Sequence, residues 1–222
     1  MKFISILVLS FIFVTGGIAQ KKPPLKTDVD SFSYAFGVLI GNNLKMSGIT
    51  EVNYKLLGEA ISSAITAEET LISMDDAMTL MREYEMKARS KAGETALEKG
   101  KKFLEENKKR KEVTELPSGL QYEILKDAEG PKPAETDKVT THYHGTLIDG
   151  TVFDSSVERG EPIQFPLNQV IKGWTEGLQL MSVGAKYKFF IPPQLAYGDS
   201  GAGTIGPNET LIFEVELISI DK

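Results

Sequence analysis

The sequence predicts an α+β fold, with helices in its first half and a sheet carrying one short packed helix in its second. Between residues 32 and 86 apolar residues recur at helical spacing, so each helix would present one apolar face. Over residues 139–218 apolar residues alternate at period two instead, as in strands that bury one face. Asp149-Gly150, between two of these runs, is a hairpin signal. The second stretch also holds Trp174, the only tryptophan, among many other aromatic residues, and we expect them to form one apolar concavity.

The N-terminus has the pattern of a signal peptide over residues 1–19. Met1-Lys2 precedes an apolar or small run over residues 3–17, and Ala19 is a small residue at the expected cut. The run is short for a membrane span, which needs about 20 residues. We therefore expect an exported protein in the periplasm. The alternatives are the outer surface and membrane anchoring by an uncleaved signal.

Composition narrows the chemistry that this chain can perform. Its 222 residues include no cysteine and carry a formal net charge of −6. This excludes disulfides, thiol chemistry and a lipid-modified cysteine, and the acidic balance argues against a broad nucleic-acid surface. We expect no cofactor and no metal. His142 and His144, the only histidines, share a strand face and make a metal site a minor alternative.

We expect a flexible lead-in over residues 20–29, a helical domain over residues 30–86 and a connecting helix over residues 87–115. Asp30 or Ser31 can cap the first helix, and Ser47-Gly48 would end it. An apolar face over residues 56–65 indicates the second helix. Ser73-Met74-Asp75-Asp76 resembles a capping box, with Asp in place of Glu, at the start of the third. The third helix would run from that box through Glu112, about 40 residues or about 60 Å.

The second half of this long helix is polar on nearly every side. Residues 99–111 are mostly Lys, Glu and Asn, as in a helix that bridges solvent between domains. The alternative is an ordinary three-helix unit with a solvated tail. Gly93 and Gly100 each weaken the helix by about 1 kcal/mol relative to Ala, and both are candidate hinges.

The predicted helical domain offers little core of its own. Phe32, Phe36 and four methionines suit the matching surface of a second copy of the chain: Met74, Met78, Met81 and Met86. Symmetric dimerisation is a common solution for such units. We expect a homodimer through the N-terminal helices, with a monomeric helical cap as the alternative.

Leu116-Pro117-Ser118-Gly119 ends the helical region and opens a last domain, residues 116–222. Strand patterns cover residues 120–125, 139–147, 151–154, 185–191 and 211–217, and a helical pattern covers residues 170–181.

Eight motifs of this last domain fall in the order and spacing of the FKBP-type peptidyl-prolyl cis-trans isomerases, which the chain resembles. They occupy residues 142–147, 149–150, 153–156, 170–174, 176–177, 181–184, 195–198 and 210–217. Residues 34–37 and 40–41 resemble, more weakly, the first helix of the Mip/FkpA branch. The resemblance implies an antiparallel sheet wrapped around a short helix, prolyl isomerase activity, N-terminal dimerisation, proline-containing polypeptides as substrates and macrolide-type inhibitors as ligands.

The resemblance also implies the residues of the proline pocket. Catalytic roles fall to Phe153, Asp154, Ile171 and Tyr197, and substrate binding to Tyr143, Arg159, Ile163, Phe165, Val170, Trp174, Ile205 and Phe213. Trp174 would form the floor, and Asp154 would lie where the twisting carbonyl points. The Tyr197 hydroxyl and the Ile171 N–H would bind flanking carbonyls, and Arg159 would orient Asp154 by a bidentate pair.

Several of these residues have ordinary structural alternatives. Trp174 and Phe213 could be plain core, Asp154 could cap the turn at Ser155-Ser156, and Tyr197 could be a buried packing residue. The sequence also departs from the family pattern in two places. Ile163 replaces an aromatic residue of many members, and the loop over residues 199–207 lacks the usual His-Pro and is one residue shorter.

Three functions remain open at this point. The first is an isomerase that assists the folding of exported proteins. The second is a holdase chaperone whose helices grip unfolded chains, with a weak or dispensable pocket. The third is a dimer that displays an inert FKBP-type fold.

Overall fold

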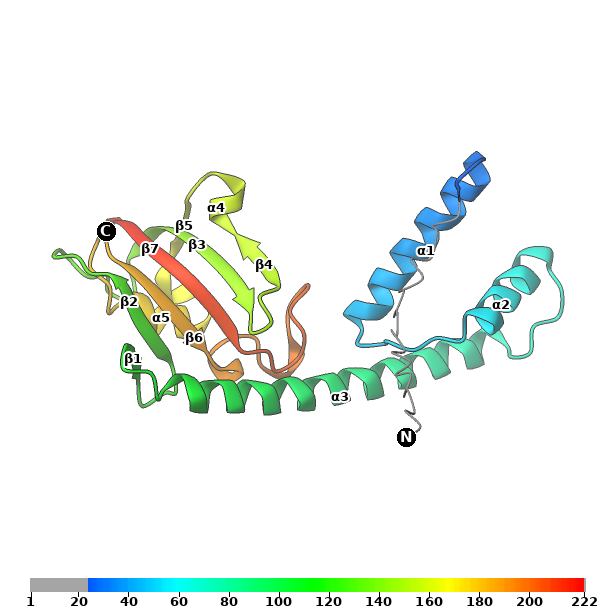
Figure 1. The fold of residues 1–222 in the computed structure, drawn as a ribbon, viewed down its shortest axis with the longest axis horizontal. Helices are drawn as coiled ribbons and strands as arrows, with labels where there is room; N and C mark the ends of the chain where they lie inside the picture. Colours follow the sequence, from blue (N-terminus) through cyan, green and yellow to red (C-terminus); the bar gives the residue numbers. More distant parts are fainter. Residues whose placement is uncertain (1–23, 222) are drawn as a thin grey trace, which may run out of the picture. The chain divides into compact units, whose positions relative to one another are not determined.

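The computed structural model describes residues 24–221, so the predicted signal peptide over residues 1–19 lies outside the described residues. The described part of the chain begins with three helices (Figure 1), which are α1 (Asp28–Met46), α2 (Tyr54–Thr66) and α3 (Met74–Asn107). Ser73 caps α3, because its Oγ accepts a hydrogen bond from the Asp76 N–H at 3.1 Å, and this predicted cap is confirmed. Within residues 24–221, no helix has both the length and the apolar character to cross a membrane.

Helix α3 ends earlier than the sequence predicts. It stops at Asn107 after 34 residues instead of continuing to Glu112. The side-chain amide of buried Asn107 donates to Oε1 of Gln121 at 2.9 Å, and the chain then turns into strand β1 (Val113–Glu115), which pairs with β2. The ladder satisfies backbone groups that a longer helix would have used, so the predicted connecting helix over residues 87–115 is wrong at its C-terminal end.

The polar half of α3 is not solvated on all sides. Gly93, Ala96, Gly100 and Asn107 are buried, and they share one face of the helix. The expectation of a solvent-bridging or solvated segment is therefore wrong for this face. The helix runs without a break through both glycines, so neither acts as a hinge in this structure.

The described residues beyond α3 form a seven-stranded sheet in the order β1-β2-β6-β7-β3-β4, with β5 also paired to β3. All strand pairs are antiparallel. The remaining strands are β2 (Gln121–Lys126), β3 (Lys138–Leu147), β4 (Val152–Ser155), β5 (Ile163–Pro166), β6 (Lys186–Ile191) and β7 (Leu211–Asp221). The predicted antiparallel sheet is confirmed, whereas the short strands β1 and β5 were not expected.

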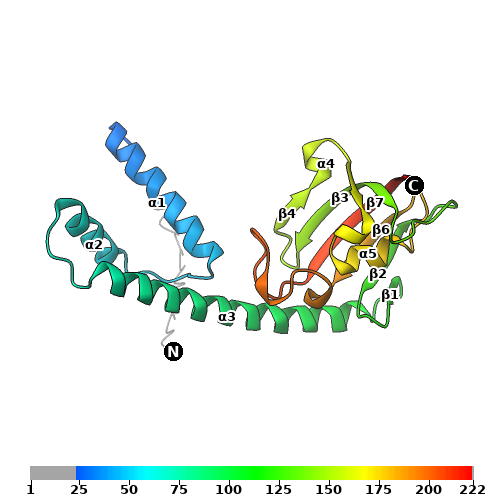
Figure 2. The same cartoon turned by 180° about the vertical axis from the view of Figure 1, so that it is seen from behind.

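Short helices fill the connections between these strands. They are α4 (Ser156–Arg159), α5 (Lys172–Leu178) and the 3-10 turns η1 (Leu167–Gln169), η2 (Pro193–Leu195) and η3 (Gly198–Ser200). Helix α5 lies across one face of the sheet (Figures 1 and 2). On strand β3 the buried residues alternate from Val139 to Gly145, as predicted.

The core lies between α5 and the sheet. Trp174 and Leu178 of α5 pack with Tyr143, Phe189 and Val215 of the strands, all of them buried. Two glycines of α5 permit this close approach. A Cβ atom on Gly177 would lie 2.6 Å from the ring of Phe189, and one on Gly173 would meet the side chain of Ile191.

We predict that Gly177→Ala destabilises the protein, although alanine favours helices. Overpacking against Phe189 costs about 1–3 kcal/mol, and this exceeds the gain of about 1 kcal/mol in helix propensity. The measurement is the midpoint of thermal or urea unfolding.

Gly130→Ala is the matched control, because its added methyl group would make only ordinary contacts, the nearest at 3.6 Å. This control should leave stability unchanged or slightly raised. Equal stability of the two variants would contradict the close packing of α5.

Candidate active site

A cavity of about 690 Å³ opens between α5, strands β3 to β5 and the loop after η3. All of the predicted site residues except Arg159 line it, namely Tyr143, Phe153, Asp154, Ile163, Phe165, Val170, Ile171, Trp174, Tyr197, Ile205 and Phe213. Residues from six separate segments therefore meet around one space. Four further residues line it, namely Gln169, which the sequence did not single out, and Ala202, Gly203 and Thr204 of the loop over residues 199–207.

Aromatic rings form the inner wall of this cavity. Trp174 packs edge-on against Tyr143 and Phe213, with ring centroids 5.2 and 5.0 Å apart, and Phe153 meets Phe213 at 5.3 Å. Such edge-to-face pairs stabilise ring positions beyond simple burial. Gly145 makes room for them, because a Cβ there would lie 2.8 Å from the rings of Phe153 and Phe213.

Trp174 and Phe213 are each 5% exposed and belong to the core cluster while also lining the cavity. The two interpretations do not exclude each other, because these two side chains belong to the core and also form the cavity wall. A ring that is fixed by the core on one side offers a rigid apolar surface on the other.

The polar side of the cavity is a triangle of Asp154, Tyr143 and Arg159. The Tyr143 hydroxyl donates to Oδ2 of Asp154, and Arg159 Nη1 donates to Oδ1 of the same carboxylate. Arg159 Nη2 donates to the Tyr143 hydroxyl at 2.8 Å. The predicted bidentate pair is therefore wrong in detail, because one guanidinium nitrogen binds the carboxylate and the other binds the phenol. The guanidinium also lies 5.6 Å from the centre of the Tyr143 ring.

This triangle keeps Asp154 ionised. Burial opposes the charge and is the largest single influence, but the hydrogen bonds from Tyr143 and Arg159 together hold the pKa of Asp154 below its ordinary value. The pKa of Tyr143 is raised, first by burial and then by its bond to the carboxylate. At neutral pH the site thus presents a fixed carboxylate beside a protonated phenol.

Asp154 does not cap the following turn. Ser155 is the cap of α4, and its Oγ accepts from the Glu158 N–H at 3.2 Å. The two histidines also have hydroxyl partners, since His142 Nδ1 lies 3.1 Å from Ser156 Oγ and His144 Nδ1 lies 3.0 Å from Ser155 Oγ.

Tyr197 lines the same cavity and is 41% exposed, so the interpretation as a buried packing residue is wrong. Its pKa is raised by burial of part of the ring and by the negative charge of Asp154, and its hydroxyl remains a donor at neutral pH. Ile205 completes the rim at 8% exposure. It is held by reciprocal backbone hydrogen bonds with Ala202 of 3.0 and 2.8 Å.

Comparison with known proteins agrees with this geometry. The family model for the FKBP-type peptidyl-prolyl cis-trans isomerase matches residues 130–218, and the model for the domain amino terminal to it matches residues 29–124. The chain is 40% identical to "Outer membrane protein MIP" of Legionella longbeachae over 100% of this chain and 98% of that protein. It is 43% identical to the "FKBP-type 22 kDa peptidyl-prolyl cis-trans isomerase" of Escherichia coli over 89% of this chain and 98% of that protein.

The crystal structure of FkpA from Escherichia coli superposes with a TM-score of 0.64 at 34% identity, covering 89% of this chain and 99% of that one. The chain therefore belongs to the FKBP-type peptidyl-prolyl cis-trans isomerases of the Mip and FkpA group. It is an enzyme that acts on proline-containing polypeptides.

We predict that Arg159→Met raises the pKa of Asp154. The folded-state pKa lies below the ordinary value of 3.8, so the carboxylate stabilises the fold above pH 3.8 and loses this contribution as the pH falls through the lowered pKa. The substitution removes the guanidinium donors that lower the pKa of Asp154, so the effect of burial, which raises this pKa, is less opposed. The measurement is an NMR titration of the Asp154 carboxyl carbon.

Arg82→Met is the control, because Arg82 lies on α3 and does not line the cavity. An unchanged titration of Asp154 in Arg159→Met would show that the arginine has no electrostatic hold on the site.

Proposed function

We propose that the aromatic cavity catalyses cis-trans exchange of X-Pro bonds by favouring the twisted amide. Amide resonance raises the rotation barrier to about 18–20 kcal/mol, and resonance is lost when the amide is twisted. The planar amide is the more dipolar form, so the apolar wall around Trp174 destabilises it relative to the twisted one. No bond to the enzyme forms, and no proton has to move.

The single observation that carries this proposal is the pairing of an apolar floor with one oriented carboxylate. We assign the proline ring to the Trp174 floor, with Tyr143, Phe153, Ile163, Phe165, Val170 and Phe213 around it. Asp154 lies beside the carbonyl carbon, which gains positive character once nitrogen no longer donates to it. The Tyr197 hydroxyl and the Ile171 N–H would bind the flanking carbonyls. Preorganised groups of this kind lower a barrier because they need no reorientation during the reaction.

The proposed substrates are polypeptides that fold in the compartment to which this protein is exported. The signal-peptide pattern of residues 1–19 supports export, and the periplasm is our proposed location. Macrolide-type inhibitors would bind in the same cavity, against its apolar floor.

We predict that Asp154→Ala lowers kcat/KM about tenfold, equivalent to about 1.4 kcal/mol of lost transition-state stabilisation. Tyr197→Phe should lower it about threefold to tenfold, since it removes one hydrogen bond to substrate. The assay is cis-to-trans exchange of Leu-Pro and Phe-Pro tetrapeptides.

Tyr122→Phe is the matched control for the tyrosine variant, because Tyr122 stacks on Tyr187 and does not line the cavity. It should retain full activity. A folded wild-type chain that fails to accelerate either peptide would refute the proposed mechanism.

We also propose that residues 30–86 form a dimerisation domain, followed by the connecting segment over 87–115 and the isomerase domain over 116–222. Large apolar side chains on the three helices support this proposal. Phe32 is 69% exposed, Phe36 is 48% exposed, and the exposed fractions of Met74, Met78, Met81 and Met86 lie between 48% and 74%. Exposed large apolar side chains mark interaction surfaces. These side chains would also suit a holdase that binds unfolded chains.

We predict that the protein without residues 1–19 sediments as a dimer and that Phe36→Asp shifts it to a monomer, because a carboxylate cannot be buried in an apolar interface without a partner. Val157→Asp is the control, since Val157 is 58% exposed on α4. A monomeric wild type would instead favour the helical cap. Lost suppression of client aggregation in the Phe36 variant, with peptide activity intact, would support a separate holdase surface.

A further inference from the structure

The loop over residues 198–208 has one side in the proline cavity. Ala202, Gly203, Thr204 and Ile205 line that cavity, and the paired backbone of Ala202 and Ile205 forms the tip of the loop. The Asn208 N–H donates to the Gly198 carbonyl at 2.8 Å and closes the base. The loop is thus a small closed unit that carries part of the cavity rim.

Such a loop is not stiff by composition. Gly198, Gly201 and Gly203 all have φ between 55° and 59°, a region that glycine enters at low steric cost but at a high cost in backbone entropy. An external support is therefore valuable for holding the tip in one place.

The base of this loop packs on the buried face of α3. Arg89 donates a guanidinium hydrogen bond to the Ser200 carbonyl. A Cβ atom on Gly93 would lie 3.2 Å from the Pro207 side chain, and one on Gly100 would overlap the Thr210 hydroxyl oxygen. These α3 positions are four and seven residues apart, so they lie on one side of the helix.

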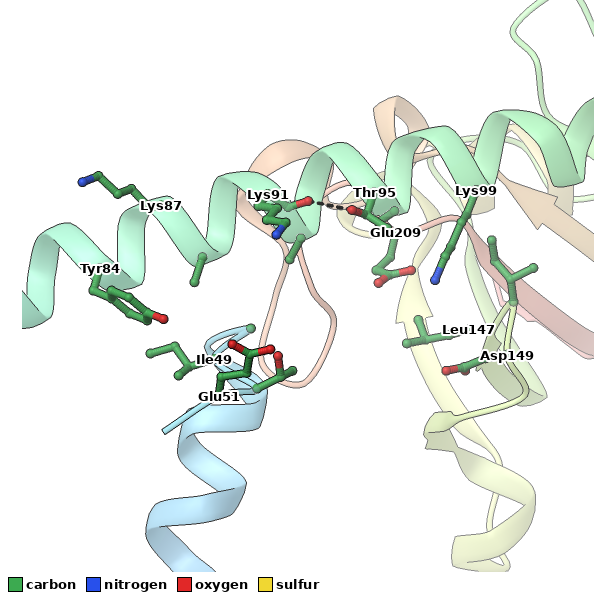
Figure 3. Close-up of a pocket in the computed structure, with 16 residues that line it drawn as sticks. Ile49, Glu51, Tyr84, Lys87, Lys91, Thr95, Lys99, Leu147, Asp149 and Glu209 are labelled. Carbon is green, nitrogen blue, oxygen red and sulfur yellow. Dashed lines mark hydrogen bonds between the residues drawn. The ribbon is translucent and has the colours of Figure 1, made fainter. Parts of the chain in front are cut away.

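Figure 3 shows a cavity next to this contact, which residues of α3 line on one side. Glu209, between the loop base and strand β7, reaches this cavity of about 830 Å³ under Thr95 and Lys99, with Asp149 opposite. Asn107 of the same helix is tied to Gln121 of β2. The helix is therefore joined both to the sheet and to the loop.

We propose that α3 positions the active-site loop. Docking of its Arg89, Gly93 and Gly100 face on residues 200–210 holds Ile205 at the rim of the proline cavity before substrate arrives. This inference rests on the proposed function of the cavity, and it makes the three α3 residues positioning residues. Without that docking, substrate would have to order the loop on binding, and this ordering would weaken binding.

The first experiment uses Gly100→Ala with a compensating partner. A methyl group at residue 100 would overlap Thr210 Oγ1, whereas its nearest contact in Gly100→Ala/Thr210→Ala is the residue 210 Cβ at 3.4 Å. The Thr210 hydroxyl is buried and has no hydrogen-bond partner among the described residues, so its removal loses no bond that the structure shows. Lys101→Ala, at an exposed neighbouring position of α3, is the matched control.

Two readouts are taken on each variant of the full chain. Hydrogen exchange at the amides of Ala202, Ile205 and Asn208 reports loop order without reference to activity. Tetrapeptide kinetics report kcat and KM separately. We expect Gly100→Ala to speed exchange at these amides about tenfold or more and to lower kcat/KM about threefold to tenfold, mainly through KM. The double variant and Lys101→Ala should match the wild type.

Arg89→Ala keeps the test decisive if Gly100→Ala fails to fold, because Arg89 is on the surface and its bond reaches only the loop. It should show the same two effects, and Arg82→Ala should show neither. Unchanged loop exchange in a folded Gly100→Ala or Arg89→Ala chain would overturn the proposal. So would a double variant that does not restore it. Failure of the cavity mechanism would appear separately, as full activity of Asp154→Ala.

Discussion

The close approach of α5 to the sheet is the constraint on which the rest of the structure depends. Gly173 and Gly177 bring the helix onto Ile191 and Phe189, and this places Trp174 among Tyr143, Phe165 and Phe213. The floor of the cavity is therefore one side of the hydrophobic core. Protein interiors are packed closely enough to keep side chains in fixed positions. The aromatic floor of the cavity is therefore held rigidly by the core.

Rigidity on the polar side comes from a different source. Asp154 is about half exposed, and burial alone would not fix it. Tyr143 and Arg159 hold the two carboxylate oxygens separately, and the Arg159 guanidinium also reaches the Tyr143 hydroxyl. Because Tyr143 packs on Trp174, the polar triangle is anchored to the apolar floor. Oriented charge and apolar wall thus form one connected arrangement.

Helix α3 extends this arrangement beyond the sheet. Gly93 and Gly100 approach the loop base, and Asn107 binds Gln121 of β2, while the lysines and glutamates of the helix are exposed. Small residues allow backbones to approach and exclude water without large apolar side chains. Helix α3, whose sequence predicts a polar connecting helix, thereby contributes to the geometry of the cavity rim.

The sequence alone determined the α+β class, the central strands and the hairpin at Asp149-Gly150, because period-two alternation records which side chains are buried. The residues of the cavity wall came from the family resemblance of the motifs and not from periodicity. Only the tertiary structure decided the end of α3, strands β1 and β5, and the docking of Gly93 and Gly100. A buried glycine leaves no apolar signal in the sequence. The Arg159 contact with Tyr143 and the Asn107 contact with Gln121 were likewise undetermined. They depend on where distant segments meet in space, and local periodicity does not encode that meeting.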